Sequence, residues 1–600
     1  MFKIRNQNLL VNHSIPISDN HEFQSFIELA KLPSVKVLHV DTESTYTPTQ
    51  NIKDGTGFTV GTSIDYELDS DGPAFSYYFP FRHKVKSLDH TYLAQIKNLL
   101  EKGKKKIVCH NVKHDILALQ SLGIDISECD FECTMLMAHQ ANENKLSYRL
   151  DTLAKELGLP GKARDKIFDL AVKLVGWDGM PPNELGEYAC TDASLLRPLR
   201  KHWLPIYQRE DDSNGECWAV DKQFILCLND IETTGAKVDL ELAAREYERG
   251  TARMAEVVKD IGLNPGSRDE LEKLLIGELE LPVVKRSPKT NKPSFDKKAM
   301  EQYDQLLEES HSPVAQLVLE YRGYQKATSS YWKSYLEHVS PDGRLRPNFN
   351  MHRTVTHRLS CDTPNLQQIP RISSKPWHGN VKQGIIPEEG YVLIGFDYKQ
   401  LELRLGAAYG KEQRLISILN DPERDIFSEM SLDLNMLRDD TKTLNYSLQY
   451  GAGIRRVSTA FGVPANTAKS IRDNYFNTYP GLRDATNLAA RVCKNKGYVK
   501  TWASRRRHFT DKYQEAHKAF NAVIQGGGFE IVKRQMVKIR KELGPNNLDC
   551  RMILQVHDEV LFEIKKEKVE YYCRIIKKIM EDVVPDFGVQ FHVSVKQWGT

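Results

Sequence analysis

The stretch that decides the fold is Tyr391–Asp397, which reads YVLIGFD. An apolar run that closes on an aspartate is typical of a buried strand with an acid at its end. A second stretch, Met552–Glu559, reads MILQVHDE, and a further apolar run begins at Val560. This pattern predicts a hairpin with Asp558 at its tip. A solvated turn is the alternative interpretation, because aspartate is favoured in exposed turns.

The two strand-end acids indicate a type of chemistry. Strand ends hold side chains rigidly, and rigid carboxylates that meet can share two Mg²⁺ ions. Ions about 3.5–4 Å apart stabilise both the attacking and the leaving oxygen of a phosphoryl transfer. Asp397 and Asp558 are therefore candidate ligands of a two-metal site.

A helix between these acids carries a second pattern. Four residues recur at intervals of four and so line one helix face: Arg438, Lys442, Tyr446 and Tyr450. The glycines at 451 and 453 provide a helix stop. Cations followed by aromatic rings suit a triphosphate and a base. A solvated basic face is the alternative.

The N-terminal third contains a separate group of acids. Two follow a predicted strand at 35–40, one follows a predicted strand at 107–109, and a tyrosine and an acid share a helix face: Asp41, Glu43, Asp115, Tyr188 and Asp192. Four converging acids can bind two metals, and a tyrosine can orient the attacking water. Each acid taken alone is better explained as a surface residue or a helix cap.

Composition limits the class of protein. A chain of 600 residues is too long for one core, so several domains are expected. It is 40% hydrophobic and 27% charged, with a net charge of +3, which is ordinary for a globular enzyme. Within that near-neutral sum, Lys494–Lys518 has a large excess of Lys and Arg and predicts a locally basic groove.

Cysteine usage and hydropathy predict the compartment. Ten cysteines occur without C-x-x-C pairs, which indicates neither a disulfide framework nor a structural zinc site. No apolar run reaches the length of a membrane span, and no secretory signal is evident. We expect a cytoplasmic protein without membrane contact.

The C-terminal motifs carry a resemblance to the family A DNA polymerases, the class of bacterial DNA polymerase I and the T-odd phage replicases. Asp397–Arg404 resembles motif A, Arg438–Gly451 motif B and Gln555–Glu559 motif C. Further matches occur at 358–360, 364–370 and 521–526, in family order, so that the resemblance covers the chain from about 220 onward.

The resemblance implies roles for individual residues. Asp397 and Asp558 would bind Mg²⁺, Lys442 would stabilise the transition state, and Glu559 would be auxiliary. The implied dNTP contacts are Arg438, Lys442, Tyr446, Tyr450, Gln400 and Glu402, the last as a steric gate against ribose. The implied DNA contacts are Arg358, Gln525, His557, Asn521, Arg506 and Asn111.

The N-terminal set resembles the three Exo motifs of DEDD-type 3′–5′ exonucleases of the tyrosine-containing (DEDDy) subgroup. This implies Asp41, Glu43, Asp115 and Asp192 as metal ligands and Tyr188 as the residue that positions water. Two Mg²⁺ ions are expected at each site, with Mn²⁺ as a substitute. Because the set is complete, the sequence predicts active proofreading.

Four positions depart from the family pattern. His357 and Ser504 stand where glycine is usual, Phe427 where histidine is usual, and Cys133 where aspartate often precedes Thr-Met-Leu. None of them is an expected metal ligand.

The expected fold is an α/β multidomain protein. Residues 1–205 form a ribonuclease H-like 3′–5′ exonuclease, and residues 206–600 form a right-hand polymerase. The thumb is expected at about 240–340, the palm at about 341–420 and 546–600, and the fingers at about 421–545.

The expected function is template-directed DNA synthesis with proofreading, by a monomer that binds primer–template DNA and dNTPs. We expect no 5′ nuclease, a pattern that favours phage replication by fold-level analogy. One rival is a single-subunit RNA polymerase, against which Glu402 and the exonuclease argue. Another is a non-catalytic DNA-binding or scaffolding protein, against which the complete ligand sets argue.

Overall fold

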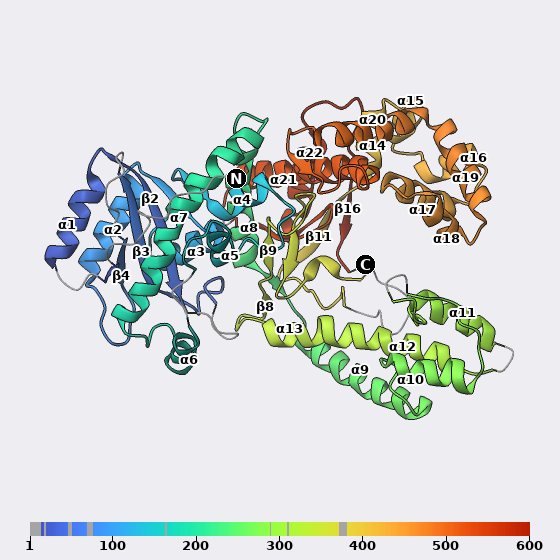
Figure 1. Cartoon of the computed structure of the whole chain (residues 1–600), viewed down its shortest axis with the longest axis horizontal. Coiled ribbons are helices and arrows are strands. Elements are labelled where there is room, and N and C mark those ends of the chain that lie inside the picture. The colour runs from blue at the N-terminus through green and yellow to red at the C-terminus, as the bar shows by residue number, and fades with distance from the viewer. Residues whose placement is uncertain are drawn as a thin grey trace.

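The computed structural model describes residues 14–16, 20–45, 51–68, 76–161, 165–287, 290–308, 311–370, 381–545 and 547–599. Figure 1 shows a sheet-containing N-terminal domain at one end, and two helical arms that open away from a second sheet at the other end. The turn-rich segment 286–294 includes positions 288 and 289, which lie outside the described residues.

The N-terminal domain is built on a mixed sheet with strand order β1-β4-β3-β2-β5-β6. Its strands are β1 (Ser14–Pro16), β2 (Val35–Ser44), β3 (Thr59–Leu68), β4 (Ser76–Pro80), β5 (Lys106–Cys109) and β6 (Phe131–Cys133). β2 pairs antiparallel with β3 and parallel with β5. β2 is longer than predicted, because pairing with β3 continues through Asp41 and Glu43 to Ser44.

Helices cover this sheet and connect it to the rest of the chain (Figure 1). They are α1 (Asn20–Lys31), α2 (His90–Lys102), α3 (Val112–Ser121), α4 (Thr134–Ala141), α5 (Leu150–Glu156), α6 (Lys166–Val175), α7 (Pro182–Glu210) and α8 (Glu216–Thr234). The long helix α7 carries both Tyr188 and Asp192, as the sequence predicts, and buries both side chains.

The second sheet is antiparallel, with strand order β14-β15-β11-β16. Its strands are β11 (Tyr391–Tyr398), β14 (Cys550–Val556), β15 (Glu559–Lys565) and β16 (Val593–Gln597), and the helices α21 (Ala519–Leu543) and α22 (Val569–Glu581) belong to the same apolar core. The predicted hairpin is confirmed: β14 pairs with β15, and Asp558 lies in the turn between them.

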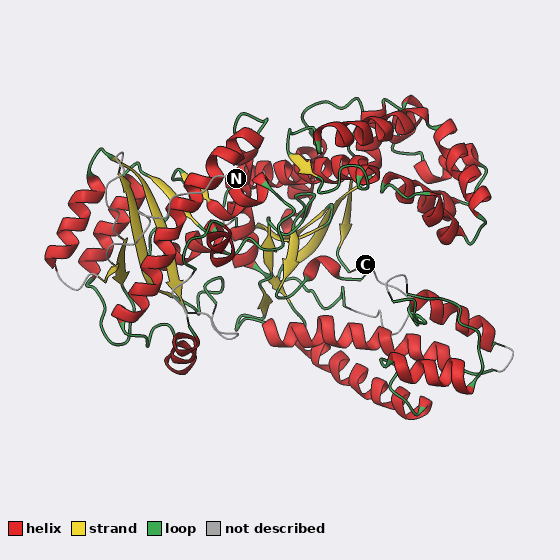
Figure 2. Ribbon diagram, viewed as in Figure 1, coloured by secondary structure: helices red, strands yellow, loops and turns green. Residues whose placement is uncertain are grey.

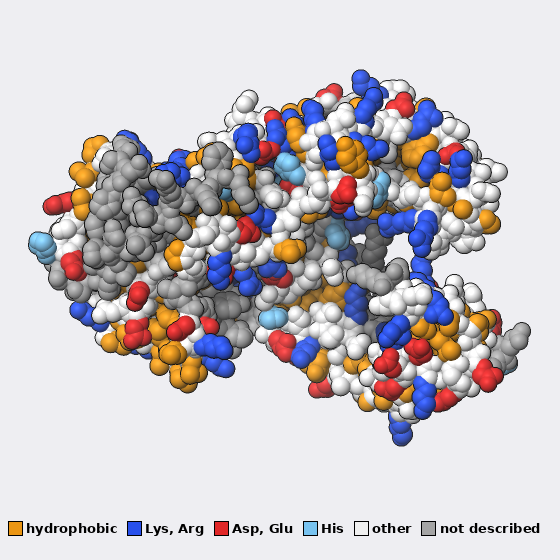
Figure 3. Space-filling model, viewed as in Figure 1, with side chains coloured by type: hydrophobic (Ala, Val, Ile, Leu, Met, Phe, Trp, Pro, Cys, Tyr) orange, Lys and Arg blue, Asp and Glu red, His pale blue; other side chains and the backbone are white. Residues whose placement is uncertain are grey.

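Two arms extend from this sheet and are almost wholly helical (Figure 2). One arm contains α14 (Leu401–Gly410), α15 (Gln413–Asn420), α16 (Ile426–Leu434), α17 (Arg438–Gln449), α18 (Ile454–Phe461), α19 (Ala465–Thr478) and α20 (Pro480–Lys496). The other contains α9 (Leu240–Ile261), α10 (Arg268–Glu272), α11 (Lys297–Leu307), α12 (Val314–Ala327) and α13 (Lys333–His338). Lys and Arg side chains edge the opening between the arms (Figure 3).

Short strands complete the fold. They are β7 (Ala236–Lys237), β8 (Arg344–Leu345), β9 (Asn348–Asn350), β10 (Ser360–Asp362), β12 (Tyr498–Lys500) and β13 (Arg506–His508). None of the helices in the described ranges is long and apolar enough to cross a membrane. All ten cysteines are free thiols.

The expected basic groove at 494–518 is wrong for part of that stretch. Arg505 is 6% exposed and forms ion pairs with Asp221 and Glu530, while Arg507, 9% exposed, pairs with Glu143. Local charge counting fails here because the carboxylates that neutralise these arginines come from distant segments. Arg507 joins the two domains through Glu143, and neither arginine faces solvent.

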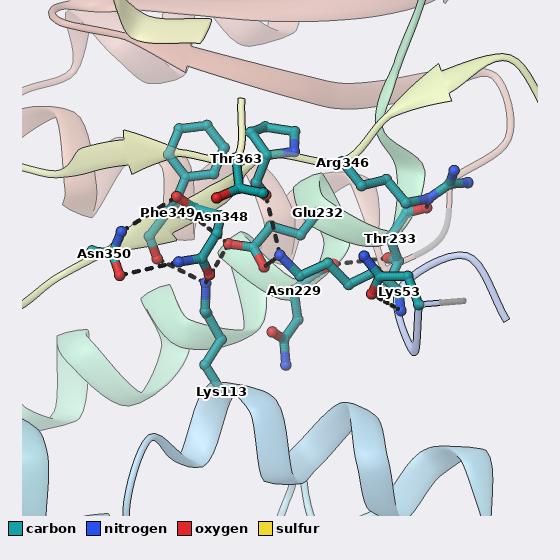
Figure 4. A network of polar contacts seen from close by, with 12 residues as sticks. Lys53, Lys113, Asn229, Glu232, Thr233, Arg346, Asn348, Phe349, Asn350 and Thr363 are labelled. Atoms are coloured by element: carbon teal, nitrogen blue, oxygen red, sulfur yellow. Dashed lines mark hydrogen bonds and ion pairs between the residues drawn. The ribbon is translucent and has the colours of Figure 1, made fainter. Parts of the chain in front are cut away.

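A second polar junction between the domains surrounds Glu232 of α8, which is fully buried (Figure 4). Lys53 Nζ lies 2.7 Å from its Oε2, Lys113 pairs with its Oε1, and the Phe349 N–H donates to Oε1 at 2.7 Å. Burial opposes ionisation, but the two lysines hold the pKa of Glu232 below its usual value. The pairs therefore anchor the N-terminal domain to β9.

Replacing Glu232 with leucine should strongly destabilise this junction. Two lysines would be left buried without a counter-charge, which costs about 3–5 kcal/mol. Lys333→Ala is the matched control, because its ion pair with Glu337 spans 3.6 Å with both side chains more than half exposed; its loss should cost less than about 0.5 kcal/mol. Urea unfolding measures both, and equal effects would contradict this account of the junction.

Candidate active sites

The first candidate site lies where β11 meets the β14–β15 hairpin. Asp397 is paired in register with Glu559, and the Tyr398 N–H donates to the carbonyl of Asp558 at 3.4 Å. Residues directly opposite in an antiparallel pair have Cα atoms about 4.5–5.5 Å apart. The backbone thus brings the turn that carries Asp558 to the end of the strand that carries Asp397.

The electrostatics of this site suit a cation. Burial raises the pKa of Asp558, and the negative charge of Glu402 adds to the effect while Arg358 opposes it. A buried acid with a raised pKa gains most from a nearby positive charge. The surroundings of Asp558 therefore fit a ligand of a divalent ion.

Glu559 lies on the neighbouring strand, β15, opposite Asp397. A Cβ atom added at Gly395 would come within 2.1 Å of Glu559 Oε1, so the missing side chain of Gly395 makes room for this carboxylate. Since side chains two residues apart lie on one face of a strand, Gly395 and Asp397 share a face. Glu559 therefore adds a third acid to the face on which Asp397 lies.

Glu402 is fixed by two partners. It is 8% exposed in the first turn of α14, pairs with the Arg358 guanidinium, and accepts a hydrogen bond from the Tyr450 hydroxyl at 2.8 Å. Gln400, two residues earlier, is the N-cap residue of α14 and has a left-handed φ of 50°. The sequence did not predict that Arg358, Glu402 and Tyr450 form one connected group.

Helix α17 has the expected basic and aromatic face. The Arg438 guanidinium contacts both carboxylate oxygens of Asp425, at 2.9 and 3.1 Å. The buried ring of Phe427 lies 5.7 Å from Lys442 Nζ and 5.9 Å from the Tyr446 ring. Phe427, where the family usually has histidine, is thus the apolar surface on which these two side chains rest. The helix ends at Tyr450, and Gly451 has the left-handed φ of 77° that suits the predicted stop.

Three of the expected DNA contacts lie near one another, and a fourth lies elsewhere. Asn521 and Gln525 lie one turn apart on α21, and a Cβ atom at the next residue, Gly526, would be 3.2 Å from the Thr356 carbonyl. This part of α21 therefore adjoins the loop that carries Arg358. The Arg506 side chain is not part of that group, because it pairs with Glu210 and Asp212.

His557 directly precedes Asp558 and has a left-handed φ of 58°. The Gln555 side-chain amide donates to the His557 carbonyl, and Gln367 Nε2 donates to Gln555 Oε1 at 2.7 Å. Gln367 thereby stabilises the turn that carries Asp558. No local pattern in the sequence announces this contact, since its partners lie 188 positions apart.

The second candidate site lies in the N-terminal domain. Ligand oxygens of Asp41, Glu43 and Asp192 all lie within 4.8 Å of one another, a grouping that could hold a metal ion. Two come from β2 and one from α7, so strand and helix supply the site jointly.

Asp115, the fourth expected acid, lies beside this group. It is 2% exposed, and Thr42 Oγ1 donates to its Oδ1 at 2.8 Å. Among the residues that the structure describes, no nitrogen or oxygen donor reaches its Oδ2, and the thiol of Cys109 is a neighbour. Burial raises the pKa of Asp115, and the charge of Asp41 adds to the effect. A buried carboxylate oxygen that accepts no hydrogen bond from nitrogen or oxygen and lies near other acids is suited to bind a cation.

Tyr188 stands one turn before Asp192 on α7 and is 4% exposed. Its ring packs against Phe168 of α6 and Trp177, at centroid distances of 5.0 and 5.9 Å. Asn111 starts α3 in a left-handed conformation, with a φ of 69°, and lines a small cavity together with Asn350 and His352.

Two supporting residues were not predicted. Thr42 stands between Asp41 and Glu43, so its place in that motif could have identified it. Asp425 could not be identified from the sequence as a partner of Arg438. It caps α16 by accepting a hydrogen bond from the Ser428 N–H at 2.8 Å, and this capping role alone accounts for an aspartate at that position.

Known protein families match both parts of the chain. A family model described as DNA polymerase family A matches residues 236–599, more than half of the chain, and one described as 3′–5′ exonuclease matches residues 15–206. The chain belongs to DNA polymerase family A. The predicted family and the α/β two-part architecture are confirmed.

Curated relatives align with different lengths of the chain. It is 33% identical to the thermostable DNA polymerase I of Thermus aquaticus over 400 residues, which is 63% of this chain and 47% of that protein. It is 27% identical to DNA polymerase I of Pseudomonas aeruginosa over 583 residues, 92% of this chain and 62% of that protein. The chain spans about half the length of the curated relatives it matches.

A solved structure shares the fold. The polymerase domain of Pol1 from M. smegmatis, in complex with DNA primer–template and dNTP, superposes with a TM-score of 0.80. The match covers 98% of this chain and 99% of that chain at 22% identity. At this identity the likeness establishes the fold alone.

Asp115→Asn should stabilise the protein in the absence of metal. The raised pKa means that folding disfavours the charged carboxylate, so its cost is absent below the unfolded pKa and grows as pH rises through the folded pKa. With a chelator at pH 8 we expect the variant to be more stable than the parent, and near pH 3.5 we expect no gain. Thermal unfolding measures it.

Asp484→Asn is the control, because Asp484 is 73% exposed and should give no such pH-dependent gain. A variant Asp115→Asn that is less stable than the parent at pH 8 would contradict this description of the site.

Proposed function

We propose that this protein is a template-directed DNA polymerase that extends a primer 3′ end and removes misincorporated nucleotides by 3′–5′ exonuclease activity. The observation that carries the proposal is the presence of two separate acid groups, each in its own domain. One lies beside a basic and aromatic helix, and the other contains three acids within mutual reach of one ion. Family membership supports both activities.

At the polymerase site Asp397 and Asp558 would hold Mg²⁺, with Mn²⁺ as a substitute. The bound ions would supply a Lewis acid for the primer hydroxyl and the departing pyrophosphate. Arg438 and Lys442 would bind the triphosphate on α17, and Lys442 would offset charge that develops in the transition state. Arg438 must exchange its contact with Asp425 for the phosphate, or share it.

Glu402 would select deoxyribose. Arg358 and Tyr450 hold its carboxylate, so it cannot swing away freely from a sugar that carries a 2′-hydroxyl. A fixed carboxylate favours DNA over RNA synthesis and argues against a single-subunit RNA polymerase. Extension of one primer with dNTPs or with NTPs distinguishes these two functions.

At the exonuclease site Asp41, Glu43, Asp115 and Asp192 would hold Mg²⁺. Tyr188, fixed between Phe168 and Trp177, would orient the attacking water. Arg358, Gln525, His557 and Asn521 would contact the primer terminus and minor groove at the other site, with Asn111 on DNA in the exonuclease.

The remaining assignments also belong to this proposal. The partners would be primer–template DNA and dNTPs, bound by a monomer in the cytoplasm. Ten free thiols agree with a reducing compartment. The domain boundaries at 205/206 and within the hand would follow the limits given by the sequence.

Paired substitutions should separate the activities. Asp397→Asn should lower primer extension at least about 100-fold, because a ligand charge at the reacting phosphate is lost, and should spare 3′ digestion. Asp41→Ala with Glu43→Ala should do the reverse. The assay uses a mismatched primer terminus with and without dNTPs. Loss of both activities in either variant, with the fold retained, would contradict the separation of the sites.

Tyr446 should make the enzyme accept dideoxynucleotides readily. Its phenolic hydroxyl can supply the hydrogen bond that a nucleotide without a 3′-hydroxyl lacks. Tyr446→Phe keeps the ring on Phe427 and should increase discrimination against dideoxynucleotides at least about tenfold. Single-nucleotide incorporation with competing substrates measures the ratio. Strong discrimination by the parent enzyme would remove this assignment.

A further inference from the structure

His357 has a backbone conformation that favours glycine. Its φ is 59°, within the left-handed region that non-glycine residues adopt rarely. It is nevertheless 7% exposed, so its ring is enclosed by protein. A strained residue in a buried position is maintained only when its surroundings hold it there, and such positions gather at functional sites.

Two contacts hold His357. Its Nε2 donates to the Arg506 carbonyl at 2.9 Å, since a carbonyl can only accept. Its ring meets the ring of His139 at a centroid distance of 5.0 Å and an interplanar angle of 75°, an edge-to-face contact. His139 belongs to α4 of the exonuclease domain and is 1% exposed.

His139 also reaches the turn that precedes His357. Its Nε2 donates to the Thr354 carbonyl at 3.1 Å. The same carbonyl accepts from the His357 N–H at 3.3 Å, and Thr354 Oγ1 donates to the Arg358 carbonyl at 2.5 Å. The turn from Thr354 to Arg358 is therefore closed by its own bonds and held from outside by one exonuclease side chain.

Arg358 leaves this turn toward the polymerase site. Its guanidinium pairs with Glu402, whose other oxygen accepts from Tyr450. A shift of the turn would move the base of the Arg358 side chain. The two histidines thus lie at the start of a chain of contacts that ends at the residues expected to meet the nucleotide.

We propose that His139 and His357 are positioning residues for DNA synthesis, through which the exonuclease domain fixes the turn that presents Arg358 to the primer terminus. The inference rests on the proposed function. It makes the exonuclease domain a part of the polymerase site even when digestion is abolished.

Both histidines act as neutral donors in this arrangement. Burial lowers the pKa of His139 to about 3 and holds the pKa of His357 well below its usual value. Neighbouring cations such as Arg505 and Lys533 also disfavour a second proton. Each ring therefore keeps one N–H, and in each case the structure directs it to a carbonyl.

The test uses the full chain with Asp41→Ala and Glu43→Ala as the parent, so that digestion does not obscure extension. His139→Leu removes the donor and the ring, whereas His139→Gln retains an amide donor. We expect kcat for matched extension to fall about 5- to 20-fold in His139→Leu, with an unchanged KM for dNTP, and to recover largely in His139→Gln.

His83→Gln is the matched control. His83 is also buried in the exonuclease domain and bonds to Tyr78 and to the Met180 carbonyl within that domain. It should leave extension unchanged. If it impairs extension as much as His139→Leu does, general damage to the domain explains the effect and the inference is overturned.

A primer that ends in 3-deazaadenine tests whether Arg358 has moved. This base lacks the minor-groove acceptor N3, so its substitution should slow the parent enzyme. In His139→Leu the slowing caused by 3-deazaadenine should be much smaller, because an Arg358 side chain that is already displaced makes no contact with N3 that the modified base could remove. Equal penalties in both proteins would overturn the inference.

His357→Gly provides an independent variant that suits the backbone and should fold. It should show the same loss of kcat and the same reduced 3-deazaadenine penalty. Extension at the parent rate by both His357→Gly and His139→Leu would overturn the inference while leaving the proposed function intact. Failure of the parent to extend any primer would instead remove the proposed function.

Discussion

The structure depends on the register of two antiparallel strands. Because β11 pairs with β15 so that Asp397 lies opposite Glu559, the turn that carries Asp558 comes to the end of β11. A slip by one residue would turn Asp397 to the other face of the sheet. The pairing runs from Tyr391 opposite Lys565 to Asp397 opposite Glu559, so hydrogen bonds and core packing together prevent that slip.

Other parts of the polymerase site are placed relative to this strand. Helix α14 starts at Leu401, directly after β11, which sets Glu402 near Asp558. From Glu402 the contacts lead to Arg358 on one side and to Tyr450 at the end of α17 on the other. Side chains from segments far apart in the chain thus share one buried carboxylate, which makes this part of the candidate site stiff.

The sequence predicted the helices and strands better than the tertiary contacts between them. The strand at 391–397, the hairpin around Asp558 and the helix of Arg438 were correct because hydrophobic periodicity and a glycine stop are local signals. The basic groove was wrong for Arg505 and Arg507; for example, the acid that neutralises Arg507, Glu143, lies 364 positions away in the sequence. The left-handed backbone at His357 and Ser504 could be suspected only because glycine was expected there. Their packing depends on tertiary contacts that no local pattern encodes.

In the proposed mechanism, Asp397 and Asp558 share divalent ions at a primer terminus. Anomalous diffraction from a crystal of the enzyme with primer–template, incoming dNTP and Mn²⁺ would locate these ions. We expect two peaks about 3.5–4 Å apart, with oxygens of both aspartates in contact with them. Peaks that contact only one of these residues, or carboxyl groups more than about 8 Å apart with no common ion, would contradict it.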